Sequence, residues 1–307
     1  TESTIALLVG ILSFSASVTQ PLFGAIADRF GRRRVAASGL ILNAVLLSLV
    51  GVVSNSTLLI LLFLIGGLGS GALHPAGASI VRSGITHNKG LAVSTGGTLG
   101  YALGPVIILY VVSNLGLGFT PWFMIPGVLL GVAVYIFTPE DGHSHTDQKA
   151  KFFDIRMLTG PVGLLSLSGV FASLAFVTFT SAVPLWLVAT HEIAPDDPLI
   201  GWTLAAFTLA AALGGMAAAA LSSRIEQRLL ISGSLLLSPF PLLLMFALEP
   251  NTPPFFLTIM AGGALIHASL PLMIVSAQNL APQSTATAAG MLMGFSTGIA
   301  GILYVGV

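Results

Sequence analysis

The chain has 307 residues, of which 55% are hydrophobic and only 7% charged, with a formal net charge of zero. Soluble domains are about 25% charged, so this sequence cannot build a water-covered surface, and a helical membrane protein is indicated. The zero net charge gives no electrostatic basis for a nucleic-acid partner. The absence of cysteine excludes disulfides and thiolate metal sites.

Ten apolar stretches are each close to the length of about 20 residues that a membrane-spanning helix needs. In chain order, the predicted spans are 4–26, 35–53, 57–82, 89–113, 118–138, 160–189, 199–221, 229–248, 255–280 and 285–307. The chain begins at Thr1 instead of a methionine and stops at Val307 inside an apolar run. We therefore expect a fragment of a longer protein.

The 11 Lys and Arg residues all lie in or beside the loops that follow the first, third, fifth and seventh spans. The intervening loops contain none. Because translocation of basic loops is unfavourable, this alternation predicts that the basic loops and the central linker are cytoplasmic. A multi-pass protein of the cell (inner) membrane, in contact with the lipid bilayer, is expected.

A polar stretch, PEDGHSHTDQKAKFFDIRML, divides the spans into two sets of five. GAIADR at 24–29 is echoed by AALSSR at 219–224, and His74 by His267 at a nearly equal separation. These echoes predict a duplicated bundle with two pseudo-symmetric halves and a substrate site between them. The expected parts are an N-terminal bundle (1–138), a linker (139–159) and a C-terminal bundle (160–307).

The segment GAIADRFGRRRV, which begins at Gly24, resembles the signature loop of the major facilitator superfamily, G-x-x-x-D-R-x-G-R-[RK]. In that family the loop joins the second and third of twelve helices. The resemblance therefore implies an all-α integral membrane protein of the major facilitator fold, with ten of twelve transmembrane helices present. It covers the whole chain.

Three further segments resemble the fosmidomycin-resistance group of efflux transporters. They are GLGSGALHPAG (67–77), KGLAVSTGGTLGYALGP (89–105) and AQNLAPQSTATAAGMLMGFSTGIAGI (277–302). Two positions differ from what such transporters carry. Ala76 stands where the group usually has an acidic residue, and Leu62 stands near the position where many proton-coupled drug antiporters have an arginine.

The family resemblance implies that the charged loop is a conformational latch, which joins the two halves on the cytoplasmic side in the outward-facing state. The latch is assigned to Gly24, Asp28, Arg29, Gly31, Arg32, Arg33 and Arg82. A charge at the membrane centre costs roughly 2.5–3.5 kcal/mol, and less near the interface, so Asp28 needs a partner. Arg82 is one option, and the helix N-terminus around Ser284 and Thr285 is the other. For the arginines, a purely topological role is the alternative.

Polar side chains inside the spans predict a substrate and proton path, because such residues usually face the bundle interior. Ser70 and His74 lie four residues apart on one face of the third span. His267, Ser269 and Gln278 lie in the eighth span. An imidazole titrates near neutral pH and can carry a coupling proton. The alternative is that each histidine only hydrogen-bonds a neighbouring helix.

Gly100, Gly104 and Pro105 resemble the G-x-x-x-G-P core of the helix 5 motif found in antiporters. Ordinary packing of small residues beside a proline kink is the alternative explanation.

The sequence thus predicts a secondary active transporter, a proton-coupled exporter of a small organic compound or drug that works by alternating access as a monomer. No cofactor and no metal is expected, and the protein is not expected to be an enzyme. The alternatives are an uptake carrier of the same fold and a non-transporting membrane sensor or assembly protein on this scaffold.

Overall fold

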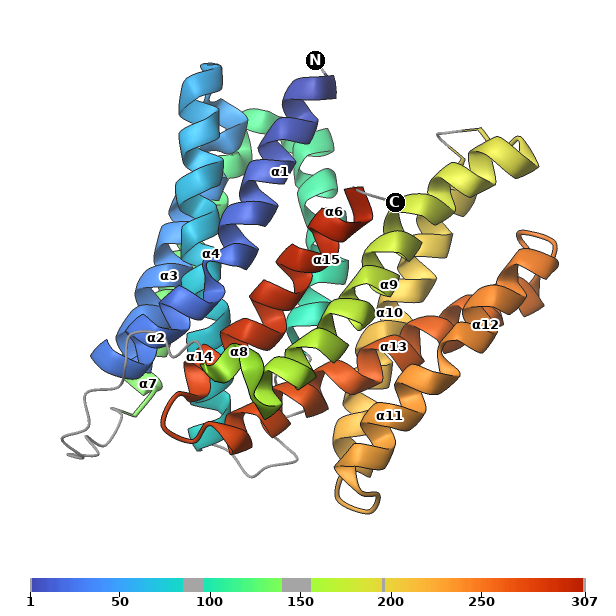
Figure 1. Ribbon diagram of the computed structural model, residues 1–307. Helices are drawn as coiled ribbons and strands as arrows, with labels where there is room; N and C mark the ends of the chain where they lie inside the picture. The colour runs from blue at the N-terminus through green and yellow to red at the C-terminus, as the bar shows by residue number, and fades with distance from the viewer. Residues whose placement is uncertain (1, 85–95, 140–155, 195–196, 306–307) are drawn as a thin grey trace. The chain divides into compact units, whose positions relative to one another are not determined.

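The computed structural model describes residues 2–84, 96–139, 156–194 and 197–305, and within these ranges the chain forms helices and no strands (Figure 1). In chain order the elements are α1 (Glu2–Val18), α2 (Gln20–Phe30), α3 (Arg32–Ser48), η1 (Leu49–Val52), α4 (Ser56–Gly84), α6 (Gly96–Leu115), η2 (Leu117–Phe123), α7 (Met124–Phe137), α8 (Arg156–Thr159), α9 (Pro161–His191), α10 (Pro198–Leu221), α11 (Gln227–Leu237), α12 (Pro239–Leu244), η3 (Met245–Ala247), α13 (Pro253–Leu280), α14 (Thr285–Gly290), η4 (Met291–Phe295) and α15 (Ser296–Val305).

Eight helical segments of the described chain are long and apolar enough to cross a membrane, and a bent pair, Gly10–Val18 with Gln20–Phe30, makes a ninth. The bend between the two parts of the pair is 42°. Of the ten predicted spans, the one at 89–113 corresponds in part to α6, and its first residues lie outside the described ranges. The predicted all-helical, multi-pass architecture is confirmed.

The helices form two compact units. The first comprises Thr1–Gly84, Pro105–Leu167 and Ser276–Gly298; the second comprises Ile85–Gly104, Ser168–Val275 and Ile299–Val307. The first unit thus contains α2 and α14 together. The expected boundaries at 138 and 160 stay a prediction, and most of the expected linker lies outside the described residues.

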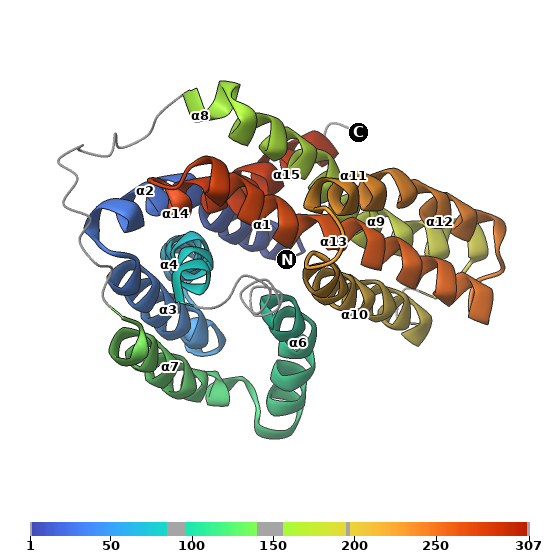
Figure 2. The same ribbon diagram turned by 90° about the horizontal axis from the view of Figure 1, so that it is seen from below.

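In the first unit, α3 packs against α4 on one side and α7 on the other (Figures 1 and 2). Small residues make the first contact possible: a Cβ added at Gly39 would lie 2.6 Å from the carbonyl oxygen of Gly69. Membrane helices pack through such close backbone approach because lipid gives them little hydrophobic drive to associate.

The seam between α2, α3, α4 and α14 has a buried centre of alanine and valine, against which larger side chains such as Phe23 and Ile26 pack. Its buried members are Ala27, Val35, Ala36, Ala72, Ala76 and Ala286. Ala76 has no exposed surface. The presence of alanine here, where the resembling group usually has an acidic residue, therefore has a structural reason. A carboxylate at this position would be buried among methyl groups.

The second unit has an aromatic and aliphatic core. The rings of Phe179 in α9 and Phe207 in α10 stack with centroids 3.8 Å apart. The same core includes Leu187, Phe255 and Ile259, all without exposed surface.

We expect close packing at Gly69 to be required for stability. An added Cβ there would lie 2.8 Å from both Asn43 N and Gly39 O, so Gly69→Ala should lower the free energy of unfolding by about 1–3 kcal/mol, the usual range for overpacking. Gly77, on the same helix, is the matched control, since a Cβ there meets nothing within 4 Å. The thermal unfolding midpoint in detergent measures both variants. Equal midpoints for the two would contradict this account of the α3–α4 contact.

Candidate functional site

The turn between α2 and α3 consists of one residue, Gly31. Its φ of 102° lies in the left-handed region that side chains with a Cβ rarely adopt. Gly31 N donates to Ala27 O at 3.0 Å, which ends α2, and α3 starts at the next residue. The sequence requirement for glycine at this position is therefore conformational.

Asp28, in the last turn of α2, acts as the cap of α14. Its Oδ1 accepts a hydrogen bond from Ala286 N at 3.1 Å, and its Oδ2 accepts from Thr287 N at 3.0 Å and from Thr287 Oγ1 at 2.9 Å. The residue that precedes α14, Ser284, makes no side-chain cap hydrogen bond. Asp28 thus accepts from the second and third amides of α14, the donors that a cap residue normally satisfies, and its charge complements the helix dipole.

The carboxylate is almost fully enclosed, since the Asp28 side chain is 2% exposed. Arg32 Nε lies 3.7 Å from Asp28 Oδ1, one turn further along the chain. A Cβ added at Gly24 would lie 2.5 Å from Ala286 O, so α2 and α14 touch backbone to backbone. Gly24 and Asp28 are four residues apart and share one face of α2.

Of the predicted latch residues, Gly24, Asp28, Gly31 and Arg32 therefore gather at this contact. Arg29 and Arg33 have other neighbours: the Arg29 guanidinium lies over the Phe30 ring, and Arg33 Nη1 donates to Thr138 O at 3.4 Å. The side chain of Arg82 lies outside the described part of the chain.

A second polar contact at the same helix end was not anticipated. The hydroxyls of Ser79, in α4, and Thr285, the first residue of α14, are hydrogen-bonded to each other. Both residues are buried. Serine and threonine are common inside apolar spans, and nothing in the local sequence distinguishes this pair from others.

The middle of the same helix departs from α geometry, because Met291–Phe295 forms a π-helical turn. Ser296 Oγ lies within hydrogen-bond distance of two carbonyl oxygens, Ser166 O at 2.9 Å and Met291 O at 3.0 Å, which share its one proton. Gln20 packs against this turn, and a Cβ at Gly294 would meet its side chain at 2.5 Å. Gln20 Oε1 is buried and accepts no hydrogen bond within the described residues. A glutamine inside a predicted span was a signal that could have identified it.

The predicted path residues have different environments. His74 is exposed and Ser70 is partly buried on α4. His267 is partly buried, and its ring centroid lies 5.1 Å from that of Phe176. Ser269 Oγ donates to Ile266 O of its own helix at 2.9 Å. Gln278 is 1% exposed, and its Nε2 makes no hydrogen bond within the described residues.

The helix 5 motif lies on α6. A Cβ added at Gly100 or Gly104 would meet nothing within 4 Å among the described atoms, and both glycines are exposed. The side chain of Pro105 lies outside the described part of the chain. The assigned role of this motif stays a prediction.

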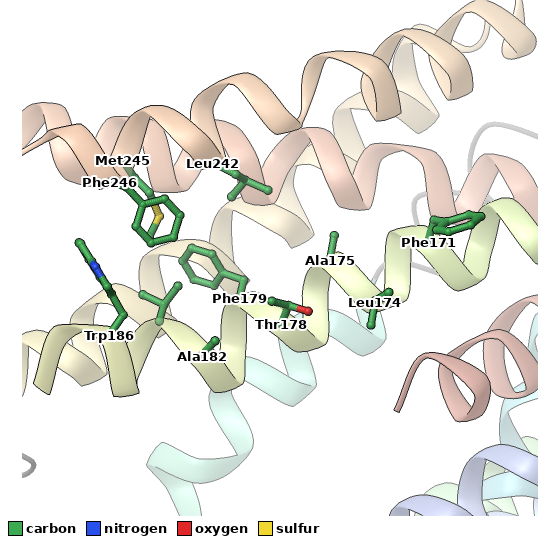
Figure 3. A pocket seen from close by; sticks show the side chains of 11 residues that line it. Phe171, Leu174, Ala175, Thr178, Phe179, Ala182, Trp186, Leu242, Met245 and Phe246 are labelled. Atoms are coloured by element: carbon green, nitrogen blue, oxygen red, sulfur yellow. The ribbon is translucent and has the colours of Figure 1, made fainter. Parts of the chain in front are cut away.

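The second unit contains a pocket of about 450 Å³ between α9 and the α12–η3 segment (Figure 3). Its walls are apolar and include Phe171, Phe179, Leu242, Met245 and Phe246. Among the residues that line it, only Thr178 and Trp186 have a side-chain nitrogen or oxygen atom. Its chemistry suits an apolar occupant, and the sequence analysis did not identify it. No cluster of three or more metal-ligating side chains occurs in the described ranges.

The family model described as Major Facilitator Superfamily matches residues 1–305. The chain is 27% identical, over 96% of its length and 75% of the relative, to an uncharacterized MFS-type transporter, YfnC, of Bacillus subtilis (strain 168). Its structure is similar to that of the E. coli fucose:proton symporter FucP, with a TM-score of 0.73, 16% identity and coverage of 98% and 83% of the two chains. It is also similar to the human organic anion transporter MFSD10 (TETRAN), with a TM-score of 0.67, 19% identity and coverage of 96% and 75%.

The Ser79–Thr285 contact yields a prediction for stability. Ser79→Ala and Thr285→Ala should each be destabilising, and a double-mutant cycle should give a coupling of about 0.5–1.5 kcal/mol, the usual net value of a hydrogen bond. Ser38→Ala is the control, because its hydroxyl donates to Val35 O on its own helix. Denaturant unfolding in detergent measures all the variants. Strictly additive effects would mean that the hydroxyl pair contributes nothing to the contact between α4 and α14.

Proposed function

Because this chain belongs to the Major Facilitator Superfamily, whose members are membrane carriers of small molecules and not enzymes, we propose that it exports a small organic compound in exchange for protons by alternating access. The chain has the major facilitator fold and is a multi-pass transporter. The direction, the coupling ion and the assignment to a drug-efflux group belong to the proposal. So do the inner-membrane location and the cytoplasmic position of the basic loops.

The observation that carries the proposal is the cap that Asp28 provides for α14. In the predicted division, α2 belongs to the N-terminal half and α14 to the C-terminal half. On that division, the Asp28 carboxylate of the N-terminal half accepts from two backbone amides and one hydroxyl of the C-terminal half. Opening this contact requires all of these groups to find new partners, so it favours the conformation in which this end is closed.

The distribution of basic residues supports placing this closed end on the cytoplasmic side. Arg29, Arg32, Arg33 and Arg34 surround the turn, and basic loops stay in the cytoplasm. We propose that this contact stabilises the outward-facing state of the carrier. Hydrogen bonds to a charged group contribute about 1.5–3 kcal/mol each, which is enough to hold one state of a carrier and weak enough to be reversed by a substrate.

The proposed coupling uses the histidines of the path. His74 and His267 are the titratable side chains of the predicted substrate and proton path, and their positions correspond in the two predicted halves. The contact of His267 with Phe176 supports a place beside an aromatic wall. The resemblance of the segment around His74 to an efflux group supports export over uptake.

Reconstitution of the full-length protein in liposomes with an imposed pH gradient tests this function. A lipophilic organic cation or a neutral drug inside the vesicles should leave against the proton flux, with measurable proton counterflow. Uptake with protons moving in the same direction would favour the alternative carrier. The absence of transport across a broad compound panel would favour a sensor or assembly protein.

The latch makes a specific prediction for Asp28→Asn. The amide loses the charge and replaces one of the two accepting oxygens with an NH2 group, which would face a donor of α14. Transport should therefore fall by at least about tenfold, the effect of losing roughly 1.4 kcal/mol. Asp197→Asn is the matched control, because within the described ranges the Asp197 side chain accepts from Leu199 N of α10, the helix that it caps. Transport rate and amount of inserted protein are measured together. Loss of insertion, with normal activity per inserted molecule, would mean that the carboxylate serves folding.

A separate prediction concerns the coupled proton. If an imidazole carries it, His74→Gln or His267→Gln should alter the pH dependence of proton-driven transport, because glutamine does not titrate. Substrate exchange without a proton gradient should be retained. The measurement is transport rate against pH for each variant in the full-length protein. Unchanged profiles for both would remove these histidines from the coupling mechanism and leave them packing roles.

A further inference from the structure

The turn that presents Asp28 to α14 has a second, cationic surface. We call Arg29, Arg33 and Arg34, with the aromatic side chains of Phe30, Tyr135 and Phe137, the arginine surface. Arg29 and Arg34 are exposed. The three aromatic side chains are exposed by 57%, 46% and 82%, respectively.

Arg33 links the start of α3 to the end of α7. Its guanidinium lies 4.7 Å above the ring of Tyr135, and its Nη1 donates to Thr138 O directly after α7. The last turn of α2 is separated from α3 by Gly31 alone, so it lies next to this contact, and Figure 2 shows α7 beside α3.

The acidic side chain on these helices contacts α14. Asp28 is the one acidic residue in the sequences of α2, α3 and α7. Its carboxylate is enclosed by the first turn of α14 and by Arg32. The turn thus separates its charges, with the carboxylate against α14 and the guanidiniums of Arg29 and Arg34 exposed.

We propose that the arginine surface binds the phosphate of an anionic phospholipid headgroup. Clusters of arginine next to membrane-spanning helices attract anionic lipids, and each residue near the bilayer surface contributes about 1 kcal/mol. Guanidinium groups bind phosphate oxygens in a bidentate manner. A lipid is the occupant because Tyr135 is an exposed aromatic residue of the kind that gathers at headgroup level, and the exposed rings of Phe30 and Phe137 offer apolar surface to acyl chains. Free phosphate would make no use of them.

The experiment uses the purified full-length protein in neutral detergent micelles. The probe is a short-chain phosphatidylglycerol with a fluorophore on one acyl chain, compared with the matching phosphatidylcholine. Binding is measured by anisotropy in about 0.1 M salt, where the Debye length is about 10 Å. The readout is lipid affinity, so the result does not depend on whether the protein exports, imports or transports at all.

We expect phosphatidylglycerol to bind in preference to phosphatidylcholine. The double variant Arg29→Gln/Arg34→Gln should weaken phosphatidylglycerol binding about 25-fold, because each arginine contributes about fivefold at the membrane surface. Arg224→Gln/Arg228→Gln is the matched control. It removes the same charge from two exposed arginines at another loop, and it should leave the affinity near that of the unmodified protein.

Three results would overturn the proposal. Equal loss in the two double variants would indicate a general effect of net charge and no site. Equal affinity for the two lipids would show that the headgroup charge is not recognised. Displacement of the probe by millimolar inorganic phosphate would indicate an anion site that does not require a lipid.

The unmodified protein gives an independent test if the Arg29→Gln/Arg34→Gln variant does not fold. Raising the salt to 1 M shortens the Debye length to about 3 Å and should release phosphatidylglycerol. Binding that is unaffected by salt would contradict an arginine–phosphate contact, because only the apolar part of the probe would then hold it to the protein.

Discussion

The first amides of a helix have no acceptor within the helix, and those of α14 belong to buried residues. The carboxylate of Asp28 satisfies two of them, Ala286 N and Thr287 N, across sequence separations of 258 and 259 residues. The helix N-terminus needs an acceptor, and the buried carboxylate needs donors. Each is unfavourable without the other, so the contact fixes α2 against α14. Gly24 permits the approach of the two backbones, and Gly31 permits the chain to turn directly after the cap.

The apolar surroundings of a membrane protein also explain why small residues make so many of the helix contacts. Lipid chains are as apolar as leucine, so helices gain by close backbone approach and not by burying apolar surface. Gly39 lies against Gly69, and Gly290 and Gly294 lie against Gln20. Ala76 belongs to this pattern, since it fills a seam of small side chains where the resembling group usually has an acid. A tightly packed seam can close or open, but it cannot deform by small steps.

The charged turn was the part of the chain that sequence reasoning described best. A charge near the end of an apolar span requires a partner, and the N-terminus at Thr285 was one of the two that were named. The sequence did not distinguish among the arginines of the motif and assigned all of them to one latch, because a motif does not show which way each side chain points. Arg32 faces Asp28, whereas Arg33 faces Tyr135 on α7. The hydroxyl pair of Ser79 and Thr285 and the π-helical turn at Met291 left no signal in the sequence.

The sequence by itself determined that the chain is helical, that it spans the membrane many times and that its basic loops alternate along the chain. These properties depend on the total hydropathy and charge of segments of some 20 neighbouring residues, and neither total depends on the rest of the chain. Only the tertiary structure decided that Asp28 caps α14, that Ala76 closes a seam and that Arg33 joins α3 to α7. Each of these contacts brings together groups far apart in the sequence. Their partners are chosen by helix packing and by the need to satisfy buried polar groups, neither of which is a property of a local segment.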